Sequence, residues 1–284
     1  MAAPIPTIMV GAVLLAAVLH AVWNSLAKAI GDQLIGFMLI DVTGVALCLA
    51  AMPALAAPAV ASWPFIGASA CLHMGYKLVL MRSYKLGDLS QVYPLARGVA
   101  PLLVAGFAAA FVGERLGPPQ LGGILLVSVG LASLALGGSR PTAAERPAIA
   151  FALATGAFIA AYTVTDGLGV RHAGTALGYA AWLFLLDGVP IPLYVLATRR
   201  GTLGSSLRPT WRKGAASGVL ALVAYSLVLW AQTRGALAAV AALRETSVII
   251  AAAIGTVVLG ERFGRVRVLA ATLVAAGILL LNLP

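Results

Sequence analysis

The sequence predicts an all-α integral membrane protein in which ten transmembrane helices form two inverted five-helix repeats. Three observations lead to this prediction: the composition, a series of apolar segments, and a pentapeptide that occurs twice. Of the 284 residues, 61% are hydrophobic and only 10% are charged. A soluble chain of this length has no interior large enough to hide so much apolar surface, so the lipid bilayer must act as the solvent.

The apolar segments define the expected helices in order. Most are long enough to cross about 30 Å of hydrocarbon at 1.5 Å per residue, and most of the connections are short and marked by Gly, Pro or Asp. We interpret the first as a spanning helix and not as a removed signal peptide, because no basic region precedes it. The ten segments are 7–28, 34–52, 63–84, 89–112, 118–137, 148–166, 174–197, 214–233, 236–259 and 266–283.

The repeated pentapeptide is Gly113-Glu114-Arg115-Leu116-Gly117, which recurs as Gly260-Glu261-Arg262-Phe263-Gly264 after 147 residues. Each copy closes a long apolar segment, and an arginine, Arg97 or Arg244, lies 16 residues before its first glycine. A duplicated membrane unit with charges buried at equivalent places is typical of secondary transporters.

A polar stretch at 137–147 divides the segments into two groups of five. We therefore expect a first five-helix repeat at 1–138, a linker at 139–147 and a second repeat at 148–284. Because five is odd, the second repeat must enter the membrane in the opposite sense to the first, which gives a pseudo-twofold axis in the membrane plane. The repetition is clearest between 88–136 and 235–283.

The net charge of +10 comes mainly from short clusters between the apolar segments. Loops after odd-numbered segments hold 13 Lys and Arg residues, whereas the opposite side holds three, Arg115, Arg171 and Arg234. This asymmetry predicts a multi-pass protein of the cell inner membrane with both termini on the non-cytoplasmic side. It favours membrane lipid over nucleic acid as the partner of the basic residues.

Charged side chains inside the apolar segments are the candidates for a binding site, because each costs roughly 2.5–3.5 kcal/mol at the centre of a helix in lipid. Arg97 and Arg244 present planar forks suited to a carboxylate, phosphate or phosphonate, which favours an anionic or zwitterionic substrate. The alternative is internal ion pairing, of Arg97 with Asp41 and of Arg244 with Glu245 or Asp187.

Polar faces on two further helices predict additional lining residues. In the first helix, His20, Asn24 and Lys28 share one face, with Trp23 beside them, so we expect Asn24 and Trp23 to line a polar interior. Helix–helix hydrogen bonding is the alternative reading of this face.

The third helix places Tyr76 and Lys77 within one turn. Lys77 is either paired with Asp41 or free to bind an anion. Tyr162 and Tyr225 are candidates for stacking on a substrate, and aromatic packing between helices is their alternative role.

Two sets of acidic residues have different expected roles. Glu245 is a candidate proton carrier, since a carboxylate within an apolar segment can take up and release a proton as access alternates. Glu114 and Glu261 lie at membrane ends in equivalent places, which predicts a structural role: capping the next helix, or pairing with Arg115 and Arg262.

The duplicated motif after the fourth helix of each half resembles the EamA family of the drug/metabolite transporter superfamily, over essentially the whole chain. The segments His20-Ala21-Val22-Trp23-Asn24 and Tyr93-Pro94-Leu95-Ala96-Arg97-Gly98 resemble an EamA subgroup associated with phosphonate utilisation. The resemblance implies ten helices around a central cavity, lined largely by helices 1, 3, 4, 6, 8 and 9.

Together these features predict a secondary transporter of a small polar metabolite, such as an amino acid, organic acid or phosphonate-like compound, that works by alternating access. The alternative is an exporter of cationic drugs or neutral amino acids with a site formed by Glu245, Asp41 and aromatic residues. We expect no enzyme activity, metal site or cofactor, because no nucleophile–base set, metal-ligand spacing or phosphate-binding loop occurs. The oligomeric state is left open.

Overall fold

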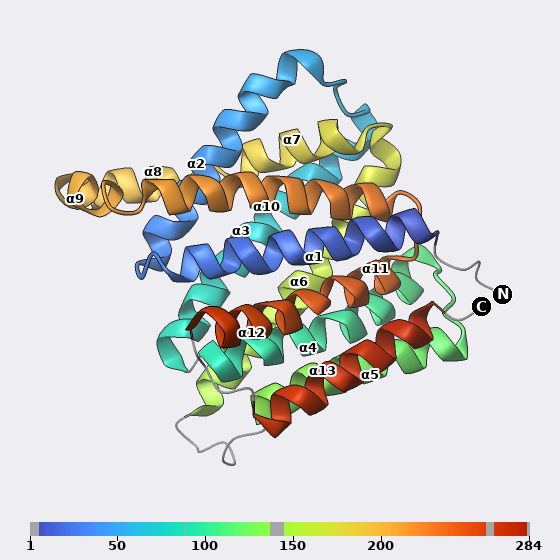
Figure 1. Cartoon of the computed structure of the whole chain (residues 1–284). Helices are drawn as coiled ribbons and strands as arrows, with labels where there is room; N and C mark the ends of the chain where they lie inside the picture. The colour runs from blue at the N-terminus through green and yellow to red at the C-terminus, as the bar shows by residue number, and fades with distance from the viewer. Residues whose placement is uncertain (1–5, 88, 137–144, 260–263, 283–284) are drawn as a thin grey trace.

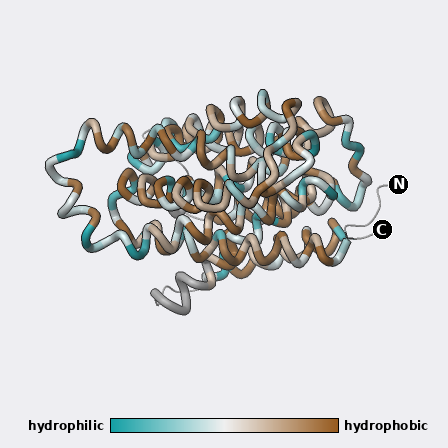
Figure 2. The backbone as a smooth tube through the Cα atoms, turned by 90° about the horizontal axis from the view of Figure 1, so that it is seen from above, coloured by the Kyte–Doolittle hydropathy of each residue, from teal (hydrophilic) through white to brown (hydrophobic). Residues whose placement is uncertain are grey.

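The computed structural model describes residues 6–87, 89–136, 145–259 and 264–282, and every regular element in these ranges is a helix. Most of the long helices lie side by side along one direction, and the two termini lie at the same end of the molecule (Figure 1). Many large apolar side chains, such as Ile8, Leu125 and Leu279, are exposed. Hydrophobic positions extend along the outer helices (Figure 2), as expected for a surface that faces lipid.

The first half of the chain forms helices over the first five predicted segments. The carboxylate of Asp32 begins the second of these helices by accepting hydrogen bonds from the amides of Leu34 and Ile35. The helices are α1 (Thr7–Lys28), α2 (Gln33–Ala51), α3 (Trp63–Leu86), α4 (Leu89–Phe107), which continues as a π-helical turn (Ala108–Val112), and α5 (Pro118–Leu136).

In the second half the helix from Arg146 runs on to Ala173, beyond the predicted segment 148–166, and two further segments are divided. Segment 174–197 is divided at Gly188 and Val189, and segment 236–259 is divided at Glu245. The helices are α6 (Arg146–Ala173), α7 (Ala176–Asp187), α8 (Pro190–Thr198), the short α9 (Leu203–Leu207), α10 (Trp211–Gln232), α11 (Leu237–Arg244), α12 (Thr246–Leu259) and α13 (Arg265–Leu281).

Within the described residues, seven helical stretches are long and apolar enough to cross a membrane. They are Thr7–Lys28, Gln33–Ala54, Gln91–Val112, Pro118–Ala135, Arg146–Ala173, Ala176–Thr198 and Trp211–Gln232. The chain is therefore a multi-pass membrane protein. The count of ten spans stays a prediction.

The helices pack between the two halves as much as within them. Helix α3 lies against α6, α1 against α10, and α5 against α13. Helix α11 is buried along its whole length, from Leu237 to Arg244. Its neighbours in the apolar core include Val104, Ile124 and Ala160. A short, fully buried helix therefore delivers Arg244 to the interior of the molecule.

Candidate functional site

The interruption between α11 and α12 brings three charged side chains to the centre of the molecule. Glu245 occupies the interruption, and its Oε2 lies 2.7 Å from Nε of Arg97 on α4. The side chains are only 2% and 4% exposed, respectively. Arg97 also donates from Nη2 to the hydroxyl of Ser247 at 3.3 Å. An arginine of the first half thus holds the broken helix of the second half.

A side-chain hydrogen bond lies beside the interruption. The hydroxyl of Thr246 donates to the carbonyl oxygen of Leu243 at 2.8 Å, and such side-chain bonds to the backbone compete with a continuous helix. Transporters commonly build their substrate sites at interrupted helices.

Arg244, the last residue of α11, is buried but takes no part in an ion pair within the described residues. Its Nη2 donates to the hydroxyl of Tyr162 at 3.3 Å, and its Nε has no hydrogen-bond partner there. Arg97, Arg244 and Glu245 together leave one positive charge without a countercharge. An uncompensated buried charge is costly, so this guanidinium is suited to bind an anionic group.

The polar face of α1 lies beside this centre, and its side chains are hydrogen-bonded to one another and to α4. Nδ2 of Asn24 lies 3.2 Å from Nε2 of His20 and donates to the hydroxyl of Tyr93 at 3.0 Å. Trp23 packs edge-on against His20, with ring centroids 4.8 Å apart. All four side chains keep some accessible surface. Sequence reasoning missed Tyr93, although its position four residues before Arg97 on one helix face was a usable signal.

Tyr162 connects the arginine to an aromatic group. His73 stacks on Tyr162 with centroids 4.0 Å apart, and Tyr76 meets it edge-on at 5.7 Å. The ring of Tyr225 lies 6.4 Å from that of Tyr162. The hydroxyl of Tyr225, however, donates to the buried carboxylate of Asp166. Tyr225 can therefore offer its ring but not a free hydroxyl.

The pairings of Arg97 with Asp41 and of Arg244 with Asp187 considered from the sequence are wrong, and Glu245 forms its ion pair with Arg97. Nζ of Lys77 lies 2.7 Å from Oδ1 of Asp41 and 2.9 Å from Oδ2 of Asp187, so both carboxylates are engaged. The physical reason is helix packing: α2 lies against α7, α8 and α10, whereas α4 lies against α5, α6 and α11. Lys77 is therefore paired and lies apart from the arginine centre.

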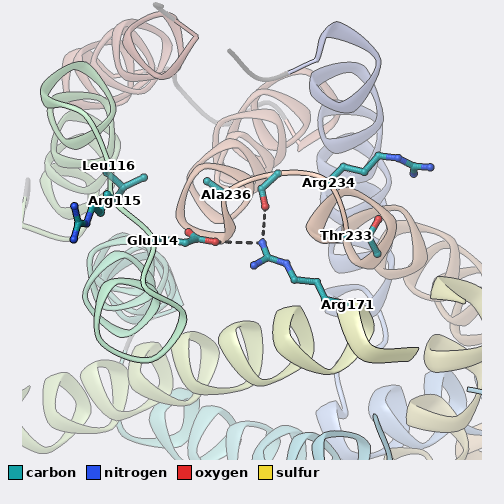
Figure 3. A pocket seen from close by; sticks show the side chains of 8 residues that line it. Glu114, Arg115, Leu116, Arg171, Thr233, Arg234 and Ala236 are labelled. Atoms are coloured by element: carbon teal, nitrogen blue, oxygen red, sulfur yellow. Dashed lines mark hydrogen bonds and ion pairs between the residues drawn. The ribbon is translucent and has the colours of Figure 1, made fainter. Parts of the chain in front are cut away.

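Glu114 also differs from its predicted role. It accepts hydrogen bonds from the amide of Leu237, with both oxygens at 3.0 Å, and pairs with Nη2 of Arg171 at 3.2 Å. It thus caps α11 instead of the next helix, α5, and pairs with Arg171 instead of Arg115. Figure 3 shows Glu114 and Arg171 pointing toward one another. The second copy of the motif, at 260–263, lies outside the described residues.

The fold and the buried charged centre together define a polytopic membrane protein with a polar core. Residues 146–283 match the sequence model of the EamA-like transporter family, and through this half the chain belongs to that family. The family indicates a membrane transporter of the drug/metabolite type. Among the solved structures that match, one crystal structure has a TM-score of 0.76 and 20% sequence identity and covers 94% of each chain, which supports the fold of both halves. No curated protein matches the chain significantly.

Proposed function

We propose that the protein is a secondary transporter that moves a small anionic or zwitterionic metabolite by alternating access. The observation that carries this proposal is the buried Arg244, which has no carboxylate partner in the described part of the chain. A bound carboxylate or phosphonate would supply the missing countercharge and accept two parallel hydrogen bonds from its fork. Amino acids, organic acids and phosphonate-like compounds all provide such a group.

The other candidate residues would complete the site around Arg244. Arg97 offers its second fork nitrogen, which bonds Ser247 in this conformation. Glu245, as the proposed proton carrier, would have to leave Arg97 in order to bind a proton. The residues expected to shape the remaining walls are Asn24, Trp23, Tyr76, Tyr162 and Tyr225. Lys77 is a weaker candidate, because Asp41 and Asp187 already neutralise it.

Alternating access would use the inverted repeat, with the first half at 1–138, the linker at 139–147 and the second half at 148–284. Two close contacts between α5 and α13 support this symmetry. Each contact becomes the other when the two halves are exchanged by the 147-residue offset. A Cβ added to Gly123 would lie 2.6 Å from the carbonyl oxygen of Gly277, and one added to Gly130 would lie 3.0 Å from that of Ala270. Gly123 and Ala270 are related by the offset, as are Gly130 and Gly277.

The packing of whole helices supports the same symmetry. Helices α1 and α6 form the first predicted segment of each half, and α3 and α10 form the third, so the α3–α6 contact and the α10–α1 contact are equivalent. The α5–α13 contact joins two helices that are themselves equivalent. These contacts favour ten spans related by a pseudo-twofold axis, with helices of both halves around the central charges.

The alternative function is export of cationic drugs or neutral amino acids through an acidic and aromatic site. It requires that both central arginines be neutralised. In the described residues Glu245 neutralises Arg97, but no carboxylate pairs with Arg244. The observed charge balance therefore favours the anionic substrate.

Ligand-induced thermal stabilisation tests the proposal. The purified protein is heated with methylphosphonate, succinate, zwitterionic amino acids or lipophilic cations, with Arg244→Ala in parallel. We expect stabilisation by an anion or zwitterion that is lost in the variant. Stabilisation by cations alone would overturn the anionic site and support the exporter.

A further inference from the structure

A second polar site lies at the end of the molecule that carries both termini (Figure 1). It is a pocket of about 310 Å³, and its lining includes Arg115, Arg171 and Arg234, together with Glu114 and Thr233. Figure 3 shows Arg171 pointing toward Glu114, whereas the side chains of Arg115 and Arg234 extend away from this pair on opposite sides. All three arginines are solvent-exposed, and the lining contains only one carboxylate, so the pocket has an excess of positive charge.

These arginines are the same three that depart from the charge asymmetry of the loops. They come from three separate places in the sequence: the connection after the fourth segment, the end of α6, and the connection after α10. The fold gathers all of them around one pocket. The lining therefore has three cations and one carboxylate, a balance that favours an anionic ligand.

The three arginines do not have the same role. Arg171 is engaged, because it pairs with Glu114 and donates to the carbonyl oxygens of Gln232 at 2.9 Å and Gly235 at 2.8 Å. Arg115 and Arg234 form no ion pair within the described residues, and Arg234 stacks over the ring of Trp230 at 4.5 Å. Two exposed charges thus flank the pocket, and the Arg171–Glu114 pair forms its floor.

The floor of the pocket leads toward the central arginine. The carboxylate of Glu114 caps Leu237, the first residue of α11, and Arg244 is the last residue of that helix, about 10 Å further along at 1.5 Å per residue. Gln232 Oε1 and Thr163 Oγ1 are buried near this path without hydrogen-bond partners in the described chain. Thr163 adjoins Tyr162, which bonds Arg244. Polar groups therefore continue from the pocket to the centre.

We propose that this pocket is the access site at which the anionic substrate is first collected, with Arg115 and Arg234 as its attracting charges and the Glu114–Arg171 pair as its closed floor. The inference rests on the proposed function. Like charges around a concave mouth raise the local concentration of an oppositely charged ligand and speed its association, and salt screens this effect.

The test measures uptake of methylphosphonate and succinate into proteoliposomes by wild type and Arg115→Gln/Arg234→Gln, at low and at high ionic strength. We expect the double variant to raise KM about tenfold at low ionic strength, with kcat unchanged and the difference lost at high salt. Arg115→Lys/Arg234→Lys should behave as wild type, because the attraction depends on charge alone.

Arg208→Gln/Arg212→Gln is a matched control at the other end of the molecule, since it also removes two exposed arginines, one of which lies over a tryptophan ring. Its KM should not change. Equal KM values for wild type and Arg115→Gln/Arg234→Gln at low salt would overturn the access site but would not contradict the proposed transport function. If wild type takes up neither anion, the proposed function fails, and the access site fails with it.

Discussion

Arg97 and Arg244 occupy equivalent places in the sequence, yet the structure gives them different surroundings. Arg97 has a carboxylate at 2.7 Å, whereas the hydrogen bond recorded for Arg244 goes to a neutral tyrosine hydroxyl. The difference arises because the residue after Arg244 is Glu245, whereas the residue after Arg97 is Gly98. One acidic residue in one half therefore leaves one arginine with a carboxylate partner and one without such a partner in the described residues.

Glu245→Gln tests the proton-carrier role. The amide cannot carry a proton, so we expect transport to lose its response to an imposed pH gradient. Binding of the anion should persist, because removing the carboxylate frees Arg97. Uptake into proteoliposomes with and without a pH gradient checks this, and a full response in the variant would remove the role.

The helices themselves were largely predictable, because long apolar segments bounded by Gly, Pro and Asp leave few alternatives in a membrane. The break after α7 lies just before Pro190 and Pro192, which disfavour a continuous helix. The break at Glu245 was not predictable, because Ala-Leu-Arg-Glu-Thr-Ser is compatible with a helix and the contact with Arg97 is 148 residues distant in sequence. The end of α6 was missed for a related reason: Gly167 and Gly169 continue the helix and admit Leu237 and Tyr179 closely.

The contact between α5 and α13 depends on glycine. A Cβ at Gly123 would lie 2.6 Å from the carbonyl oxygen of Gly277, so Gly123→Ala should destabilise the protein by about 1–3 kcal/mol. Gly106→Ala is the control, since nothing lies within 4 Å of its Cβ position and no loss is expected. Thermal unfolding in detergent measures both. Equal midpoints would contradict the close packing.

Lys77, Asp41 and Asp187 join the two halves of the molecule through α3, α2 and α7. The sequence suggested the pairing of Lys77 with Asp41 as one of two alternatives, but not the participation of Asp187, which depends on how the halves pack. For the candidate site, too, the sequence predicted the residues but not their partners. Charged residues inside apolar segments identified most of its members, whereas their pairing depended on tertiary contacts.

Variants that neutralise Lys77, Asp41 and Asp187 distinguish a structural role of this ion-pair cluster from a role in substrate binding. Lys77→Met leaves two carboxylates without their cation and should lower stability by about 3–5 kcal/mol. Lys77→Met/Asp41→Asn/Asp187→Asn should recover most of that loss and retain wild-type affinity for the anion. Thermal unfolding and ligand stabilisation measure the two effects. Loss of anion affinity in a stable triple variant would instead make Lys77 a substrate ligand.

The orientation of the molecule can be tested at Ser205, which is exposed in the connection between α8 and α10. With Cys48 and Cys71 replaced by Ala, we expect a cysteine at position 205 to be protected from a membrane-impermeant maleimide in intact cells. Permeabilising the cells should restore labelling. Labelling of intact cells would place this connection outside and reverse the predicted orientation.

The most direct test of the central claim compares anion binding by Arg244→Gln and by Arg97→Gln/Glu245→Gln, measured by titration calorimetry with methylphosphonate and succinate. The first variant removes the uncompensated charge, and the second removes the neutralised pair and leaves Arg244. We expect Arg244→Gln to weaken binding about 10- to 100-fold, as for loss of a charged hydrogen bond, while the double variant stays within about tenfold of wild type. Wild-type affinity in Arg244→Gln would contradict the account.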